Sequence, residues 1–387
     1  MKTNRRDFIR LTGVAGAGLF VSGLTSCAPV EGEIKFAGPI DGDMVTEFDG
    51  IVRDGNLYTT VRLAAPEGMR FKVNGIKAQF SEGLYQAEIP LTDYRNVIEL
   101  TGRGSVSKQS IVVYWLKNYT NKYRFSLDDN ILFLKDIHVN SSKYTSIFEN
   151  PYLGFLKQVH DTYGTKIHIN IYYQTEGFRL SQMTDKYKDE WRKNSDWLRL
   201  SFHALQNDPD KPYLYAGYYD VKKDCEKVMK EIRRFAGDEL LGPVTTLHWG
   251  EARVEGCRAL HDCGYKALAG YYNLEDGKPV VSYYLDAEKT NHVTERSIWC
   301  DNTEGIIHKK IHMVINNSLL NEIVPRLDEI KKDKRRSAFI DLMIHEQYFY
   351  PDYIDYQADY REKVMAAMKW ATDNGYKSSF LSDCIFN

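Results

Sequence analysis

Acidic residues and histidines stand where several β-rich runs of this sequence end. Asp128 and Asp129 follow the run 123–127 directly. Each of three later runs is followed by a histidine: His203, His248 and His345. In a parallel barrel the carboxyl ends of all strands open on one face, so these side chains would converge there. Carboxylate and imidazole together form a ligand set for Zn²⁺ or a similar divalent metal, and the pattern predicts such a site.

The elements that must position these residues begin near residue 123, where β-rich runs alternate with helical stretches. Three helical stretches end in a polar turn with a glycine, and a strand start follows Gly164, Gly264 and Gly375. Glycine is preferred just past a helix C-terminus because it adopts positive φ without strain. This repeated order of helix, glycine and strand predicts a largely parallel sheet or barrel. Helices are expected at 150–163, 221–236, 251–263, 318–332 and 358–374. Strands are expected at 123–127, 166–173, 197–202, 244–247 and 338–344. The stretch 271–316 is expected to be a long irregular loop over the barrel mouth.

The same residues carry a family resemblance: residues 123–387 resemble a polysaccharide deacetylase domain (NodB-like, carbohydrate esterase family four). The family motif Thr-Phe-Asp-Asp is matched by Ser126-Leu127-Asp128-Asp129. The motif H-S/T-x-x-H is matched by His203-Ala204-Leu205-Gln206-Asn207, where an asparagine replaces the second histidine. Of the motif R-x-P-Y-G only His248-Trp249-Gly250 remains, without the arginine and the proline. The last motif, an apolar strand that ends in histidine, fits Leu342-Met343-Ile344-His345.

The resemblance implies a distorted (β/α) barrel of the glycoside hydrolase/deacetylase type over residues 117–387, with an Asp-His-His metal site. It implies that Asp129 and His203 hold the metal, that Asp128 is the general base and that His345 is the general acid. Asn207 and His248 are the candidates for the remaining metal ligand, and an amide oxygen at 207 predicts weaker binding. Trp249 and Glu176 are assigned to substrate binding. The cofactor expected is a divalent metal, with Zn²⁺ first, and the substrate expected is a glycan.

The leading function is therefore metal-dependent hydrolysis of N-acyl or O-acyl groups on a polysaccharide or oligosaccharide. The altered second and third motifs favour a second interpretation, a catalytically degenerate lipoprotein that binds glycans on the same barrel. A third is a glycosidase on a related barrel, which needs two carboxylates at ~5–10 Å across the scissile bond. Asp128 with Glu176 or Glu346 would supply such a pair.

The first 27 residues are predicted to be a targeting signal. A twin arginine, Arg5-Arg6, precedes the short apolar run Leu11–Leu24, and Leu24-Thr25-Ser26-Cys27 closes the segment. It resembles a twin-arginine export signal that ends in a bacterial lipoprotein box. In that interpretation Cys27 becomes the acylated N-terminus. The protein is then exported and anchored by lipid to a bacterial membrane, facing the periplasm or the surface.

Residues 28–116 are predicted to form a separate β-sandwich. Short β-rich runs lie at 57–63, 70–73, 84–89, 97–100 and 110–114, separated by Gly, Asn, Asp or Pro. Strands at this spacing suggest a small sandwich, and the stretch resembles the immunoglobulin-like modules that precede catalytic domains in bacterial glycan enzymes. It contains no catalytic cluster, so a spacer is favoured over a glycan-binding module.

Composition excludes several other classes. The chain has 387 residues with 51 Lys and Arg against 53 Asp and Glu, a net charge of −2 that argues against nucleic-acid binding. No G-x-G-x-x-G or P-loop follows a strand, which argues against nucleotide chemistry. The only long apolar run is N-terminal, which excludes a multi-span membrane protein. The five cysteines after Cys27 show no CxxC zinc pattern and are expected to be mostly buried free thiols.

Overall fold

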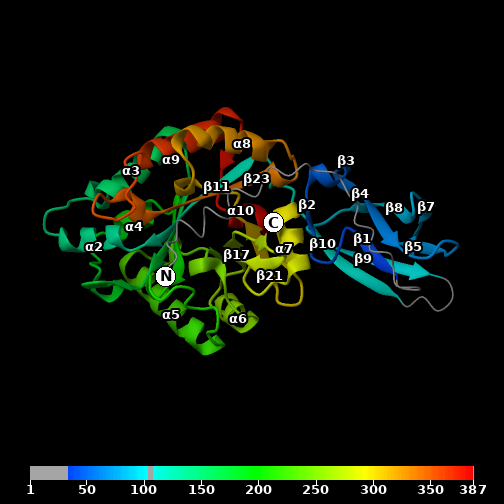
Figure 1. Ribbon diagram of the computed structural model, residues 1–387, viewed down its shortest axis with the longest axis horizontal. Helices are drawn as coiled ribbons and strands as arrows, with labels where there is room; N and C mark the ends of the chain where they lie inside the picture. The colour runs from blue at the N-terminus through cyan, green and yellow to red at the C-terminus, as the bar shows by residue number, and fades with distance from the viewer. Residues whose placement is uncertain (1–33, 103–107, 387) are drawn as a thin grey trace. The chain divides into compact units, whose positions relative to one another are not determined.

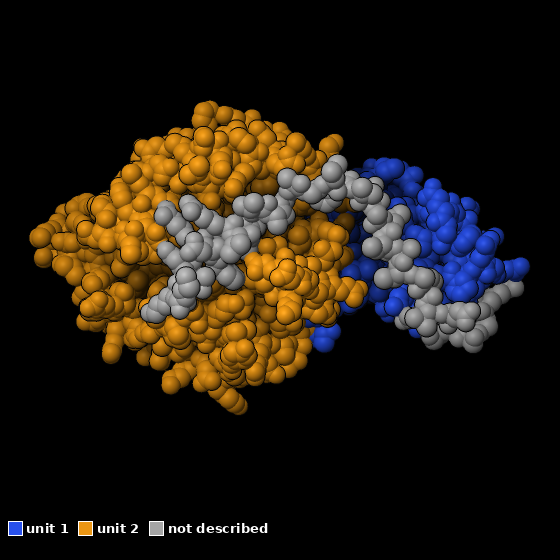
Figure 2. All heavy atoms as spheres, in the orientation of Figure 1, with its two compact units in different colours: residues 1–120, 299–303, 387 blue, residues 121–298, 304–386 orange. Residues whose placement is uncertain are grey.

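The computed structural model describes residues 34–102 and 108–386, so the predicted signal segment and Cys27 lie outside the described residues. The chain divides into two compact units, coloured separately in Figure 2. Of the described residues, unit 1 comprises 34–102, 108–120 and 299–303, and unit 2 comprises 121–298 and 304–386. Within the described ranges, every helix is too short or too polar to cross a bilayer.

Unit 1 contains two β-sheets. In one sheet the order is β1-β4-β8-β7, with β3 paired to β4, and in the other it is β2-β10-β9-β5-β6. Neighbouring strands are antiparallel except for β2 and β10. The strands are β1 (Lys35–Gly38), β2 (Met44–Val45), β3 (Ile51–Arg53), β4 (Asn56–Ala64), β5 (Phe71–Val73), β6 (Ile76–Lys77), β7 (Gln79–Ser81), β8 (Leu84–Leu91), β9 (Arg95–Gly102) and β10 (Gln109–Trp115).

One apolar core serves both sheets of unit 1. Every second residue of β4 is buried, among them Leu57, Val61 and Leu63, and Ile98 and Leu100 of β9 belong to the same cluster. Because side chains alternate between the faces of a strand, this pattern gives each sheet one inner face. The predicted two-sheet organisation is therefore present, whereas assignment to the immunoglobulin-like class stays a prediction.

Unit 2 is built on parallel strands, and its largest sheet has the order β15-β12-β11-β23-β22, with β24 beside the start of β11. A second parallel set has the order β16-β17-β21. Helices α3, α8 and α9 lie on one side of these strands and α5 and α6 on the other (Figure 1). The strands are β11 (Lys122–Asn130), β12 (Ile167–Tyr172), β15 (Leu198–Ala204), β16 (Val244–Thr245), β17 (Ala267–Gly270), β21 (Ile306–Lys310), β22 (Met313–Val314), β23 (Phe339–His345) and β24 (Lys377–Ser378).

The two parallel sets join at both ends into a distorted barrel. On one side the Ser201 hydroxyl of β15 donates to the carbonyl of Val244 in β16, at 3.0 Å. On the other side the chain changes sheets: Ile311 N–H bonds to β17, and His312 N–H bonds 2.9 Å away to the Asp341 carbonyl of β23. The structure thus shows the mixed α/β part of the fold predicted for residues 117–387, and the assignment to the glycoside hydrolase/deacetylase type stays a prediction.

All five predicted helices are present. The five predicted helices correspond to α3 (Pro151–Tyr163), α5 (Tyr218–Phe235), α6 (Val254–Asp262), α8 (Ile323–Lys331) and α9 (Tyr360–Asp373). Four further helices were not predicted: α2 (Leu132–Val139), α4 (Lys188–Lys193), α7 (Ala287–Arg296) and α10 (Ser382–Ile385).

The stretch 271–316 is also ordered, and the expectation of an irregular loop was wrong. It contains the hairpin β18 (Asn273–Glu275) and β19 (Lys278–Val280), helix α7, and the strands β20 (Ile298–Asp301), β21 and β22. Each strand here is too short for its period to be visible in the sequence.

Candidate metal centre

A break in the regular geometry of β11 places two adjacent carboxylates in the interior. Side chains of a regular strand alternate between its faces, so Asp128 and Asp129 would point in opposite directions. The pairing of β11 with β12 shifts register between Leu127 and Asn130, and Asp129 has a φ of +64°. Both carboxylates are consequently buried.

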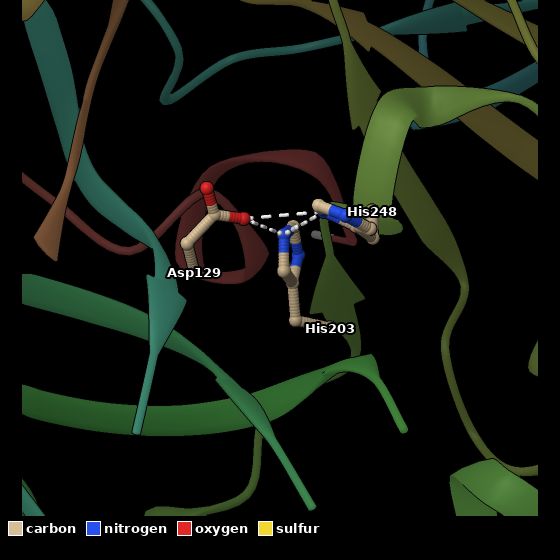
Figure 3. Close-up of side chains that lie close together, drawn as sticks. All are labelled: Asp129, His203 and His248. Atoms are coloured by element: carbon tan, nitrogen blue, oxygen red, sulfur yellow. Dashed lines mark hydrogen bonds and ion pairs between the residues drawn. The ribbon is translucent and has the colours of Figure 1, made fainter. Parts of the chain in front are cut away.

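Three side chains bring one donor atom each to a common point (Figure 3). Asp129 Oδ1 lies 3.0 Å from His203 Nε2 and 3.1 Å from His248 Nδ1. His248 Nδ1 lies 3.2 Å from His203 Nε2. Asp129 comes from β11, His203 from β15 and His248 from the 3₁₀ turn η5 (His248–Gly250) after β16, and all three are buried.

Each of the three side chains is oriented by a second contact. His203 Nδ1 lies 2.5 Å from the Thr246 carbonyl oxygen, and His248 Nε2 lies 3.0 Å from the Asn207 carbonyl oxygen. A carbonyl oxygen only accepts, so these nitrogens carry protons, and in the neutral form of each ring the opposite nitrogen presents a lone pair. Asp129 Oδ2 accepts from the Gln347 side-chain amide at 2.8 Å. Contacts of this kind fix the tautomer and direction of metal ligands.

The donor set fits a tetrahedral divalent cation. With bonds of about 2.0–2.1 Å, the donor atoms around Zn²⁺ lie about 3.3–3.4 Å apart. The separations of 3.0, 3.1 and 3.2 Å are within a few tenths of an ångström of that value. One carboxylate and two imidazole lone pairs are also the ligand chemistry that zinc prefers. Asp129, His203 and His248 therefore could hold the metal.

Asp128 and His345 stand next to each other beside this cluster. They are paired positions on the parallel strands β11 and β23. Burial raises the pKa of Asp128 to about 6, against the opposing effects of nearby His203 and of a hydrogen bond from Asn170. His345 Nδ1 lies 2.9 Å from Asn316 Oδ1, so that nitrogen carries a proton and proton exchange falls to Nε2.

The pKa of His203 depends on the two neighbouring carboxylates. Burial lowers the pKa of His203, but the charges of Asp128 and Asp129 outweigh that effect and the pKa is raised. Surroundings that favour a positive charge on the imidazole also favour a cation bound next to the neutral imidazole. The electrostatics of the cluster thus favour positive charge at its centre.

Three other predicted residues lie outside the triangle of donors. Asn207 is exposed, and its backbone oxygen rather than its side chain meets His248. Trp249 is partly buried and follows His248 with a φ of +66°. Glu176 is exposed in the turn between β13 (Gln174–Thr175) and β14 (Phe178–Arg179), where its carbonyl accepts from Lys135.

Glu346, considered above as a glycosidase carboxylate, has a structural role. It is fully buried and accepts hydrogen bonds from the backbone N–H groups of Ile131, Leu132 and Phe133 at 2.6, 2.9 and 2.7 Å. These are the free donors at the start of α2, which a carboxylate satisfies best. A carboxylate held in this way is not available to a scissile bond.

Four residues at the site belong to no sequence motif and were not predicted. Tyr172 and Asn170 come from β12, Gln347 follows β23, and Thr246 supplies only its backbone oxygen. Tyr172 is one of 27 tyrosines in the chain. Its place at the end of a predicted strand, beside the strand of the paired aspartates, is the one signal that would have selected it.

No family model matches the chain, and no curated protein matches it. Solved structures with some likeness include 4-alpha-glucanotransferase from Thermococcus litoralis, at 11% identity over 69% of this chain with a TM-score of 0.46. This chain spans only 40% of that enzyme's length. A putative polysaccharide deacetylase from Mycobacterium smegmatis has 9% identity over 67% of this chain and 85% of its own, with a TM-score of 0.38. A mutant CE4 family pseudoenzyme has 6% identity over 72% of this chain and 77% of its own, with a TM-score of 0.37.

Proposed function

We propose that this protein is a metal-dependent hydrolase that removes N-acyl or O-acyl groups, such as acetyl, from a glycan. The observation that carries the proposal is the triangle of Asp129, His203 and His248 donor atoms with Asp128 and His345 beside it. A divalent cation, with Zn²⁺ as the first choice, would polarise an acyl carbonyl there and lower the pKa of a water molecule. The glycan is proposed from the resemblance of the sequence motifs.

The chain's own residues then divide the proton transfers. Asp128 has a pKa of about 6, so at neutral pH it is ionised and able to take a proton from the attacking water. His345 is held by Asn316 at Nδ1 and returns a proton through Nε2 to the departing amine or alkoxide. Asn170 fixes the direction of the Asp128 carboxylate through a 2.7 Å hydrogen bond.

The structure gives no support to the carboxylate pair that the glycosidase alternative requires. It needs a second carboxylate opposite Asp128, but Glu346 is bound to the start of α2 and Glu176 is exposed in a hairpin turn. The alternative of a glycan-binding barrel without turnover keeps the same metal ligands. It differs from the hydrolase only in the rate of acyl release.

The test combines metal content with product analysis. Purified protein is incubated with Zn²⁺ and dialysed, and metal is measured in wild type, Asp129→Asn, His203→Gln and the control His261→Gln, whose ring contacts Lys266 instead. We expect near-stoichiometric metal in wild type and control and loss in the two ligand variants. Acetate and reducing sugar released from N-acetylated and O-acetylated oligosaccharides are then measured together.

The outcomes separate the candidates. Acetate release that depends on metal supports the hydrolase. Bound metal and bound glycan without acetate would support the binding protein, and reducing sugar without acetate would support the glycosidase. A wild type that retains no metal would overturn the proposal.

We also propose that the protein is exported and anchored through Cys27, with the module at 28–116 acting as an immunoglobulin-like spacer. The twin arginine and the lipobox support export, and the two-sheet structure of unit 1 supports the spacer. Mass spectrometry of the mature N-terminus should find an acylated Cys27. A Cys27→Ser variant should lose the lipid and leave the membrane fraction.

A further inference from the structure

The hydroxyl of Tyr172 lies against the proposed metal ligands. Tyr172 is the last residue of β12 and is buried. Its Oη atom lies 2.5 Å from Asp129 Oδ1, 3.0 Å from His248 Nδ1 and 3.3 Å from Asn207 Oδ1. Two of these three atoms are donors of the metal centre.

The ring nitrogens that face this cluster are the ones not bonded to backbone oxygens. His203 Nδ1 and His248 Nε2 contact carbonyl oxygens, so His203 Nε2 and His248 Nδ1 are directed at Asp129. In the neutral rings these two nitrogens present lone pairs, and the Asp129 carboxylate and the Tyr172 oxygen add further acceptor atoms. A cation bound among these atoms would interact with all of them.

The four atoms form one compact group. Six separations join Asp129 Oδ1, His203 Nε2, His248 Nδ1 and Tyr172 Oη. Five of them are known and run from 2.5 to 3.2 Å. The 2.5 Å between Tyr172 Oη and Asp129 Oδ1 is a hydrogen-bond length, shorter than the about 3.3–3.4 Å between two donors on one Zn²⁺. The two oxygens must therefore move apart for both to bind the cation.

We propose that Tyr172 is the fourth donor to the metal in the resting protein. This inference rests on the metal centre of the proposed function. On coordination, the hydroxyl proton passes to solvent and the oxygen bonds to the cation. Catalytic zinc centres keep one position for water or substrate. Turnover in this protein therefore requires Tyr172 to move aside or the coordination number to rise.

The competing arrangement is a tyrosine that stays a hydrogen-bond donor to Asp129 and never touches the metal. The two arrangements differ in electronic structure. A phenolate bound to Cu²⁺ gives a charge-transfer absorption in the visible range and resonance-enhanced ring vibrations, whereas a hydrogen-bonded phenol gives neither. Copper also follows zinc in its preference for imidazole ligands.

The experiment uses the full-length protein loaded with Cu²⁺, and compares wild type with Tyr172→Phe and Tyr173→Phe. Tyr173 is the matched control because it is adjacent, and its described contacts are backbone hydrogen bonds and a Lys227 side chain 5.7 Å from its ring. We expect the charge-transfer band in wild type and in Tyr173→Phe and its loss in Tyr172→Phe, which still binds one equivalent of metal. Competition with a chelator should show about tenfold or greater weakening of Zn²⁺ binding in Tyr172→Phe alone.

Each result decides the assignment. Metal uptake without the band, or the same band in Tyr172→Phe, would overturn the tyrosine ligand and leave the proposed hydrolase intact. The band together with no acyl release from any acylated sugar would keep the ligand and overturn the hydrolase. Absence of metal uptake in wild type would overturn both.

Discussion

The side-chain amide of Asn170 donates to Asp128 Oδ1 at 2.7 Å, from the strand next to that of the aspartate. The hydrogen bond stabilises the ionised carboxylate and so lowers its pKa, whereas burial raises that pKa to about 6. Proton abstraction by Asp128 requires the ionised form. Its pKa therefore sets the pH below which acyl release should fail.

The first prediction concerns this pH dependence. As pH falls, kcat/KM for acyl release should decline with an apparent pKa at or below about 6, because a bound cation lowers the pKa further. Asn170→Leu removes the stabilising donor and should move this limb to higher pH. Rate profiles of both proteins on one acylated substrate measure the shift. An unchanged limb in Asn170→Leu would show that the amide does not act on the base.

The second prediction concerns Gln347, which donates to the outer oxygen of Asp129. Gln347→Leu introduces an apolar side chain of similar size and leaves Asp129 Oδ2 without this donor. Because such contacts orient metal ligands, Zn²⁺ affinity should fall by about 10–100-fold. Titration against a chelator measures it. Gln357→Leu is the control, since Gln357 instead donates to the Asn316 carbonyl, and equal losses in both variants would contradict a specific role.

The third prediction separates structure from chemistry at Glu346. Glu346→Ala leaves three N–H groups at the start of α2 without their acceptor and should lower the free energy of unfolding by about 2–4 kcal/mol. Urea denaturation followed by circular dichroism measures the loss. Glu322→Ala, at the more exposed start of α8, should cost less. A stable Glu346→Ala protein would mean that the carboxylate is not a helix cap.

The fourth prediction concerns the ion pair inside the barrel. Arg124 and Asp341 are paired positions on β11 and β23, joined at 3.0 Å and almost fully buried. Asp341→Asn leaves a buried guanidinium without its counter-charge and should cost about 3–5 kcal/mol of stability. The exposed pair Lys157–Asp161 provides the comparison, and Asp161→Asn should change the stability by no more than about 0.5 kcal/mol. Equal effects in the two unfolding curves would overturn this account.

The sequence predicted those parts of the centre that depend on strand ends. Asp128, His203 and His345 lie within the last three residues of their strands, and parallel strands bring such positions to one face whatever lies between them. The glycines after the helices were equally informative: Gly164, with a φ of +64°, ends α3 as expected.

Other features depend on information that the pattern does not hold. Gln347 and Asn170 contact the aspartates through the register of neighbouring strands, which no spacing in the sequence states. Asn207 matched a motif position, yet its backbone oxygen contacts His248 and its side-chain oxygen contacts Tyr172 rather than the triangle of donors. Glu346 was a catalytic candidate because the sequence shows an acid beside a histidine. The sequence does not show that this acid accepts hydrogen bonds from the start of α2.

The left-handed backbone of Asp129 determines which mutations this chain can absorb. At a φ of +64°, asparagine and glycine are the replacements that the backbone accepts most readily. A single change at this position can therefore remove a donor of the proposed metal centre without straining the backbone of β11. Loss of the proposed activity at position 129 thus needs no compensating change elsewhere in the strand.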